Sequence, residues 1–132
     1  MSKRLNGKQM EQLLQALGDR TRLRILNLIQ EEEVCVCFFV GSLETLQPKI
    51  SRHLAYLRKA GLVSARRDGK WMHYSLVVPE DPNAAEVVRA ALAWAAADEE
   101  MRADRKRFEA VCCSMPQLVP IERRPKPAPA RA

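Results

Sequence analysis

The chain has 132 residues, of which 47% are hydrophobic and 29% are charged, and its formal net charge is +6. That length suits one domain with a modest core and is short for an enzyme with a deep pocket. No segment approaches the ~20 consecutive apolar residues of a membrane-spanning helix, and the first residues, MSKRLNG, lack the apolar run of a signal peptide. We therefore expect a cytoplasmic protein without a membrane partner.

The first thirty residues predict two helices. Apolar residues recur at helical spacing from Lys8 to Leu17, and Gly18 follows as a stop signal. A second helix is expected from Thr21 to Gln30, where the apolar residues are too dense for a helix with a single buried face. This second helix should lie in the core.

A pair of cysteines, Cys35 and Cys37, precedes a short helix predicted from Phe38 to Leu43. Residues two apart point about 200° away from each other in a helix but share a face in an extended segment. The pair can therefore hold one ion only if this segment is extended or the first helical turn unwinds. A nearby helix N-terminus lowers the pKa of a thiol and favours the thiolate that binds metal. Thiolates select soft ions, whereas calcium and magnesium prefer oxygen ligands.

A basic helix is expected next, with Thr45 as its N-cap, Pro48 in its first turn and Gly61 at its end. Its apolar residues recur on one face, so that its polar and basic faces remain exposed. The short helix and this one form a helix-turn-helix pattern, in which the second helix enters the major groove. The residues expected to approach the DNA are Gln47, Lys49, Ser51, Arg52 and His53, the last being more typical of a packed or phosphate-contacting position.

A β-hairpin is predicted after this helix. Its strands run from Leu62 to Arg66 and from Trp71 to Leu76, and the Asp68-Gly69 pair between them favours a tight turn. The hairpin would be the wing of a winged helix-turn-helix. Between positions 47 and 74 the chain has seven basic residues and one acidic residue, which concentrates positive charge on the predicted DNA-binding unit. The wing residues expected to contact phosphate or the minor groove are Arg66, Arg67 and Lys70.

The last part of the chain predicts a long helix and a tail. An alanine-rich helical segment from Ala84 to Cys113 carries apolar residues on more than one face, which favours a homodimer formed through the terminal helices. Residues 114–132 contain five prolines and are predicted to be a disordered basic tail. The expected fold is thus mainly α with a small β-hairpin, with residues 1–113 forming the DNA-binding and dimerisation domain.

Four segments of the chain resemble the ArsR/SmtB family of dimeric winged-helix metal-responsive repressors, and specifically its arsenic-responsive members. The segments are LGDRTRLRIL at 17–26, EVCVC at 33–37, QPKISRHL at 47–54 and KAGLV at 59–63, and they align without gaps over roughly half of the chain. The resemblance implies a repressor of a metalloid-resistance operon that leaves operator DNA when As(III) or Sb(III) binds its cysteines.

The chain departs from the arsenic-responsive pattern at two positions. Val40 stands where a third cysteine is common, and Phe38 replaces an aspartate that commonly follows the second cysteine. If the resemblance holds and three thiolates bind the ion, the third sulfur must come from Cys112 or Cys113. A family site built from Asp and His on the last helix is not expected, because neither histidine of the chain lies in that segment.

The four cysteines leave two other functions open. In a reducing cytoplasm they are expected to be thiols or metal ligands rather than a disulfide framework. All four could hold Cd(II) or Pb(II), or the two pairs could form a disulfide in a redox- or persulfide-sensing repressor. An enzyme is disfavoured, because the sequence has no Cys-x-x-Cys motif, no base near the cysteines and no cofactor loop.

Overall fold

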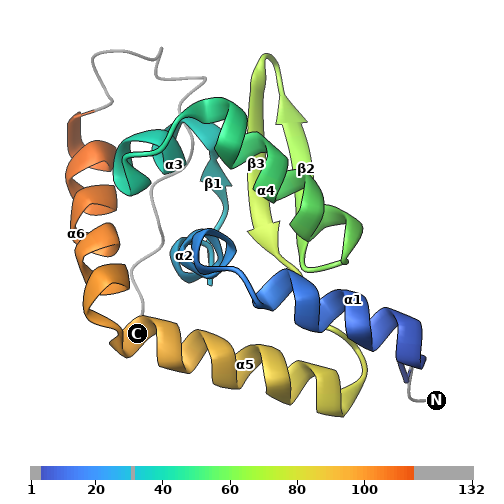
Figure 1. Cartoon of the computed structure of the whole chain (residues 1–132). Coiled ribbons are helices and arrows are strands. Elements are labelled where there is room, and N and C mark those ends of the chain that lie inside the picture. Colours follow the sequence, from blue (N-terminus) through green and yellow to red (C-terminus); the bar gives the residue numbers. More distant parts are fainter. Residues whose placement is uncertain (1–3, 31, 115–132) are drawn as a thin grey trace.

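The computed structural model describes residues 4–30 and 32–114, with side chains up to residue 110. Within these residues the elements are α1 (Gly7–Leu17), α2 (Arg20–Leu28), β1 (Val34–Cys35), α3 (Val36–Leu43), α4 (Gln47–Lys59), β2 (Val63–Asp68), β3 (Trp71–Leu76), α5 (Pro82–Ala97) and α6 (Glu99–Ser114). The pair α3–α4 followed by the β2–β3 hairpin confirms the predicted winged helix-turn-helix (Figure 1). None of the helices in the described part is long and apolar enough to cross a membrane.

Helix α2 lies at the centre of the molecule, with the other helices arranged around it (Figure 1). Asp19 caps its first turn by accepting a hydrogen bond from the backbone N–H of Arg22 at 3.0 Å. Its second half is inaccessible to solvent, which confirms the expected core position. The fully buried apolar residues of this stretch are Ile25, Leu26, Leu28 and Ile29.

A tight turn joins α3 to α4. Glu44 ends α3 in the left-handed conformation, with φ at 51°. The N-cap of α4 is Leu46 and not Thr45, because the Thr45 hydroxyl donates to the carbonyl of Leu43 at 2.9 Å and is directed away from the helix. Helix α4 packs through the predicted apolar face, whose buried members are Ile50, Leu54 and Leu57.

The sheet has three antiparallel strands in the order β1-β3-β2. Strands β2 and β3 form the predicted hairpin, and Gly69 takes φ of 63° in its turn. Strand β1 pairs with the other edge of β3, where Cys35 lies opposite His73. A strand of two residues is too short to show an alternating pattern, which is why the sequence predicted only two strands.

The predicted continuous helix from Ala84 to Cys113 is wrong. Asp98 is extended, with ψ of 138°, and separates α5 from α6. Its carboxylate accepts the backbone N–H of Met101 at 3.3 Å and so starts a new helix. Helix α6 therefore turns back and packs along α3 (Figure 1), where the rings of Phe38 and Phe108 meet edge to face at 5.9 Å. Apart from Ser114, which ends α6, the predicted tail lies outside the described residues.

Candidate DNA-binding surface and thiol site

Helix α4 presents its polar face to solvent. Gln47, Lys49, Ser51 and Arg52 are all exposed, whereas the apolar residues that anchor the helix are buried. Among the side chains of residues 4–30 and 32–110, neither Lys49 nor Arg52 forms an ion pair. Both cations are therefore available to phosphate or to base edges.

His53 occupies a different environment from the four exposed residues. Its side chain is only 17% exposed, and its Nδ1 atom lies 3.4 Å from Nη1 of Arg22 and 3.9 Å from the Asp19 carboxylate. Burial lowers the pKa of His53, which favours the neutral ring. The Arg22 guanidinium also stacks 4.0 Å from the centroid of the Tyr56 ring. His53 thus lies in the contact between α4 and the start of α2, a contact that no local sequence pattern indicated.

The wing residues divide into two groups. Arg67 and Lys70 are exposed in the hairpin. Arg66 is also largely exposed, but its Nε donates to a carboxylate oxygen of Glu33 at 2.9 Å. This ion pair joins the wing to the segment before β1, and the two residues are too far apart in the sequence for any local pattern to predict it.

The two thiols of the Cys35–Cys37 pair lie in contact. Cys35 ends β1 with extended backbone and is the N-cap of α3, whereas Cys37 lies in the first turn of that helix. The Sγ atoms are 3.2 Å apart, and the Cys37 thiol donates a hydrogen bond to Cys35. The extended lead-in that chelation by this pair requires is therefore present.

The environment separates the two thiols in acidity. The hydrogen bond from Cys37 lowers the pKa of Cys35 to about 7, with help from the backbone N–H groups of Cys37 and Val36 and against the effect of burial. The same hydrogen bond and burial raise the pKa of the Cys37 thiol. The pair therefore loses its first proton near neutral pH, and Cys35 then carries the thiolate character while Cys37 keeps its proton.

The pair supplies only two ligands. In the part of the chain with described side chains, no three His, Cys, Asp or Glu residues are grouped so that they could hold a metal ion. His73, opposite Cys35 on β3, does not complete such a group. Cys112 and Cys113 belong to the last turns of α6, and their side chains lie outside the described ones. The predicted four-cysteine set is thus neither confirmed nor contradicted.

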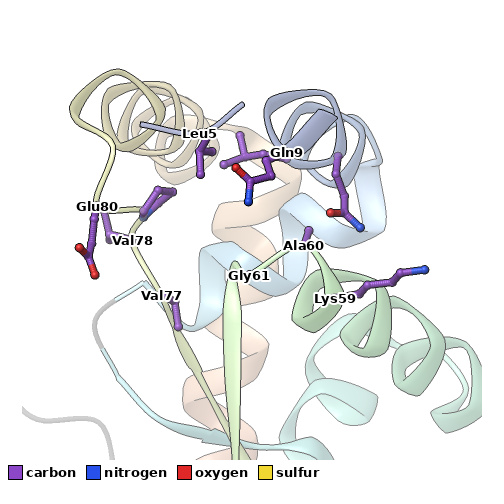
Figure 2. Close-up of a pocket in the computed structure, with 11 residues that line it drawn as sticks. Leu5, Gln9, Lys59, Ala60, Gly61, Val77, Val78 and Glu80 are labelled. Atoms are coloured by element: carbon purple, nitrogen blue, oxygen red, sulfur yellow. The ribbon is translucent and has the colours of Figure 1, made fainter. Parts of the chain in front are cut away.

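A pocket of about 430 Å³ lies elsewhere, between α1, the end of α4 and the segment after β3. Figure 2 shows Leu5 and Gln9 on one side of it and Val77 and Val78 on another, with Lys59 at the end of α4. No cysteine lines this pocket. It is therefore separate from the thiol pair, and no sequence motif pointed to it.

Comparisons with known proteins agree with this architecture. The sequence profile described as "Bacterial regulatory protein, arsR family" matches residues 19–65. The arsenical resistance operon repressor of Escherichia coli is 44% identical over 103 residues, which cover 76% of this chain and 79% of that protein. The arsenic resistance transcriptional regulator ArsR1 of Pseudomonas putida is 51% identical over 71 residues, which cover 53% of this chain and 55% of that protein.

Solved structures share the fold. HlyU from Vibrio cholerae superposes with a TM-score of 0.57 at 28% identity, covering 67% of this chain and 92% of that chain. The transcriptional repressor BigR from Xylella fastidiosa has a TM-score of 0.54 at 29% identity, covering 66% of this chain and 86% of that chain. Together with the profile match and the long alignment to the Escherichia coli repressor, these likenesses agree with the winged helix-turn-helix described above. The chain therefore belongs to the ArsR family of bacterial regulatory proteins and is a DNA-binding transcriptional repressor, not an enzyme.

Proposed function

We propose that the protein is a cytoplasmic homodimer that represses an arsenical-resistance operon and leaves its operator when As(III) or Sb(III) binds its cysteine thiolates. The observation that carries the proposal is the contact of the Cys35 and Cys37 sulfurs, 3.2 Å apart, at the start of the helix that leads into α4. An ion bound there pulls directly on the helix-turn-helix. The names of the Escherichia coli and Pseudomonas putida relatives agree with an arsenic inducer.

The two sulfurs lie close enough together to bind one ion. Two thiolates on a tetrahedral zinc ion, with Zn–S bonds of about 2.3 Å, lie about 3.8 Å apart. Trivalent arsenic carries a lone pair, and the angle between its sulfur ligands is closer to a right angle, which brings the sulfurs nearer to each other. The separation of 3.2 Å is that of a hydrogen bond between the two thiols, and a small rotation of either side chain reaches both spacings. Arsenite binding would release one water for each As–S bond formed.

The third sulfur is proposed to come from Cys112 or Cys113. Helix α6 carries both and packs against α3 through the contact between Phe108 and Phe38. Position 112 follows Phe108 by one helical turn, so the backbone of α6 reaches this position just beyond the contact with α3. The same helix from the partner copy is an equal source, and both arrangements give three thiolates.

For DNA, we propose that the start of α4 enters the major groove. Gln47, Lys49, Ser51 and Arg52 would approach base edges there, while the hairpin contacts phosphate or the minor groove through Arg66, Arg67 and Lys70. His53 would help to hold α4 on α2 and act on DNA only through that position, because its ring lies against Arg22 and Asp19.

A homodimer is supported by the surface of α5. Trp94 is 58% exposed, and Ala90, Ala93 and Ala97 are exposed on the same side of the helix. Trp94 also lines an open groove with Leu17, Leu23 and Met101. A second copy that buried this surface would place two α4 helices on one operator, as palindromic half-sites require.

Two alternatives use the same cysteines. A four-thiolate site would instead suit Cd(II) or Pb(II). A redox- or persulfide-sensing repressor is favoured by the pKa of about 7 for Cys35, because thiolates are the form that oxidants attack. In that case a disulfide between the two cysteine pairs would replace the metalloid.

Fluorescence anisotropy of a labelled operator, titrated separately with arsenite, antimonite, Cd(II), Pb(II), Zn(II) and peroxide, tests the proposal. We expect release by arsenite and antimonite, with X-ray absorption showing three sulfur neighbours around arsenic. Release by Cd(II) or Pb(II) with four sulfurs would favour the first alternative. Release by peroxide alone would favour the second, and either result would overturn the metalloid proposal.

A further inference from the structure

A buried carboxylate in α6 organises two arginines from different parts of the chain. The Asp104 side chain is 0% exposed, and its oxygens accept Nε and Nη2 of Arg24, each at 2.8 Å. Oδ1 also accepts Nη2 of Arg107 at 2.6 Å. We name this group the Asp104 cluster, formed by Asp104, Arg24 and Arg107.

The two arginines also bind the backbone at the end of α3. Nη2 of Arg24 donates to the carbonyl of Leu43 at 3.2 Å, and Nε of Arg107 donates to the carbonyl of Ser42 at 2.8 Å. The last carbonyls of a helix have no partner within the helix. The Asp104 cluster therefore supplies, from α2 and α6, hydrogen bonds that the end of α3 cannot supply for itself.

These two carbonyls lie next to the turn that leads to α4. Ser42 and Leu43 immediately precede Glu44, the left-handed residue at which the chain turns towards α4. Only Thr45 and Leu46 separate that turn from the first residue of the DNA-facing helix. The guanidinium groups of Arg24 in α2 and Arg107 in α6 therefore bind the backbone just before the turn that leads to α4.

Helix α6 also contacts the segment of the chain that precedes the thiol pair. Nη1 of Arg105 pairs with the carboxylate of Glu32 at 2.6 Å, and Nη2 of Arg105 donates to the carbonyl of Asn27 at 2.9 Å. Glu32 lies just before β1, so α6 holds the chain both before and after the Cys35–Cys37 pair. Figure 1 shows α6 lying alongside α3.

We propose that the Asp104 cluster positions α4 for operator binding and that α6 is the element through which an inducer alters that position. The second half rests on the proposed function, in which Cys112 or Cys113 at the end of α6 binds the same ion as Cys35 and Cys37. Drawing the end of α6 towards the ion shifts the turns that carry Asp104 and Arg107. The hold on Ser42 and Leu43 changes, and α4 loses the orientation that fits the operator.

Arg107→Ala is the main test, and Arg102→Ala is its matched control. Both substitutions remove one positive charge from α6, but Arg102 is exposed and its side chain makes no hydrogen bond or ion pair within the described residues. Asp104→Asn is a second variant of nearly the same shape. Because it changes a fully buried group, circular dichroism and sedimentation must first show a folded protein in the parent's oligomeric state. Arg107 is partly exposed, so its variant keeps the test valid if Asp104→Asn does not fold.

Each variant's affinity is measured for the operator and for a random duplex of equal length. A loss of α4 positioning should weaken operator binding alone, whereas a loss of general electrostatic attraction should weaken both. We expect Arg107→Ala to weaken operator binding about 5- to 50-fold relative to Arg102→Ala. Binding to random duplex should be the same for the two variants within about twofold, because they carry the same net charge. Equal operator affinities for the two variants would overturn the positioning role.

Arsenite titrations test the second half. We expect Arg107→Ala to bind arsenite as the parent does, measured by sulfur-to-arsenic charge-transfer absorbance, but to lose less operator affinity on binding. If arsenite lowers the operator affinity of Arg107→Ala by the same factor as that of the parent, the coupling through α6 is overturned and the proposed inducer stands. A parent protein that arsenite does not release would overturn the proposed inducer together with this second half, while the affinities without arsenite still decide the positioning role.

Discussion

Two arginines of α6, Arg105 and Arg107, and two cations of α4, Lys49 and Arg52, differ in their partners. Arg105 and Arg107 in α6 are held by carboxylates and backbone carbonyls. Within the described residues, Lys49 and Arg52 in α4 have no carboxylate partner and lie exposed. Net charge alone does not distinguish the two arginines of α6 from the two cations of α4. The positions of the carboxylates distinguish them, because no described carboxylate pairs with the cations on the helix that is proposed to bind DNA.

Arg66 of the wing is intermediate between the two. Its pair with Glu33 joins a side chain that is 54% exposed to one that is 32% exposed, and such solvent-screened pairs contribute little to stability. A DNA phosphate can therefore replace Glu33 at little cost. Removing one partner of a buried ion pair costs about 3–5 kcal/mol, so the fully buried Asp104 is not exchanged in this way.

Loss of the dimer should have the largest effect on the DNA-facing surface. Trp94→Asp places a charge on the proposed interface, where a central Trp contributes about 2–4 kcal/mol to association. We expect sedimentation to show a monomer at micromolar concentration, with operator affinity falling accordingly. Ala96→Asp, which places the same charge on an exposed position on the other side of the helix from Trp94, is the control. A Trp94→Asp variant that stays dimeric would place the interface elsewhere.

Loss of the thiol pair should leave the DNA-facing surface intact and remove its control. Cys35→Ser or Cys37→Ser is expected to bind operator like the parent and to show none of the ~5- to 150-fold release typical of allosteric coupling. Each single change at Cys112 or Cys113 should reduce release in part, and the double change should reduce it severely. Anisotropy with arsenite measures all of these variants. Normal release of Cys35→Ser would refute the thiol site.

Removing a free cation from α4 should weaken sequence reading. Arg52→Ala is expected to cost about 1–3 kcal/mol in operator affinity and to reduce discrimination against random duplex, because its guanidinium no longer binds a base edge. Arg58→Ala, which removes an equal charge from an exposed position near the other end of α4, is the control. Equal reductions in affinity for both duplexes would mean that Arg52 binds only phosphate.

The sequence predicted elements with a local signal better than those set by distant contacts. The apolar spacing of α4 and the Asp68-Gly69 turn are local, and both elements were found where expected. The break at Asp98 was missed because the alanine-rich sequence before it and the Glu-, Arg- and Lys-rich sequence after it both favour helix, whereas capping by one carboxylate and packing on α3 decide the outcome. Thr45 is the better N-capping residue by type, but its hydroxyl donates a hydrogen bond to the carbonyl of Leu43 and does not cap α4.

In the candidate site, too, the features with a local sequence signal were predicted and those set by distant contacts were not. Cys35 and Cys37 could be recognised from spacing, and an extended lead-in could be stated as a requirement. The contacts of Arg24, Arg107 and Arg66 could not, because their carboxylate or carbonyl partners lie far away in the sequence or carry no motif. Only the fold distinguishes an arginine that holds backbone from one that is free for DNA.

The wing should contribute affinity more than choice of sequence. Arg66→Ala with Arg67→Ala is expected to weaken operator and random duplex by similar factors. The slope of log Kd against log salt should become shallower by about 0.9 for each phosphate that the variant no longer neutralises. Arg67→Ala alone should account for most of the change if Glu33 retains Arg66 in the complex. An effect confined to the operator would instead assign base reading to the wing.

The smallest effect concerns the proton shared by the thiols. The Cys37 thiol is the main cause of the low pKa of Cys35, so Cys37→Ala should raise that pKa from about 7 towards the ordinary value of ~8.5, because only the two backbone N–H groups then oppose the effect of burial. Thiolate absorbance against pH, in a background of Cys112→Ser with Cys113→Ser, reports only this site.

The lowered pKa of Cys35 stabilises the folded state above the pKa of the unfolded thiol, and this contribution disappears as the pH falls through about 7. Cys37→Ala should therefore also flatten the pH dependence of unfolding between those values. A midpoint that stays near 7 would show that the start of α3, and not the second thiol, holds the charge on Cys35.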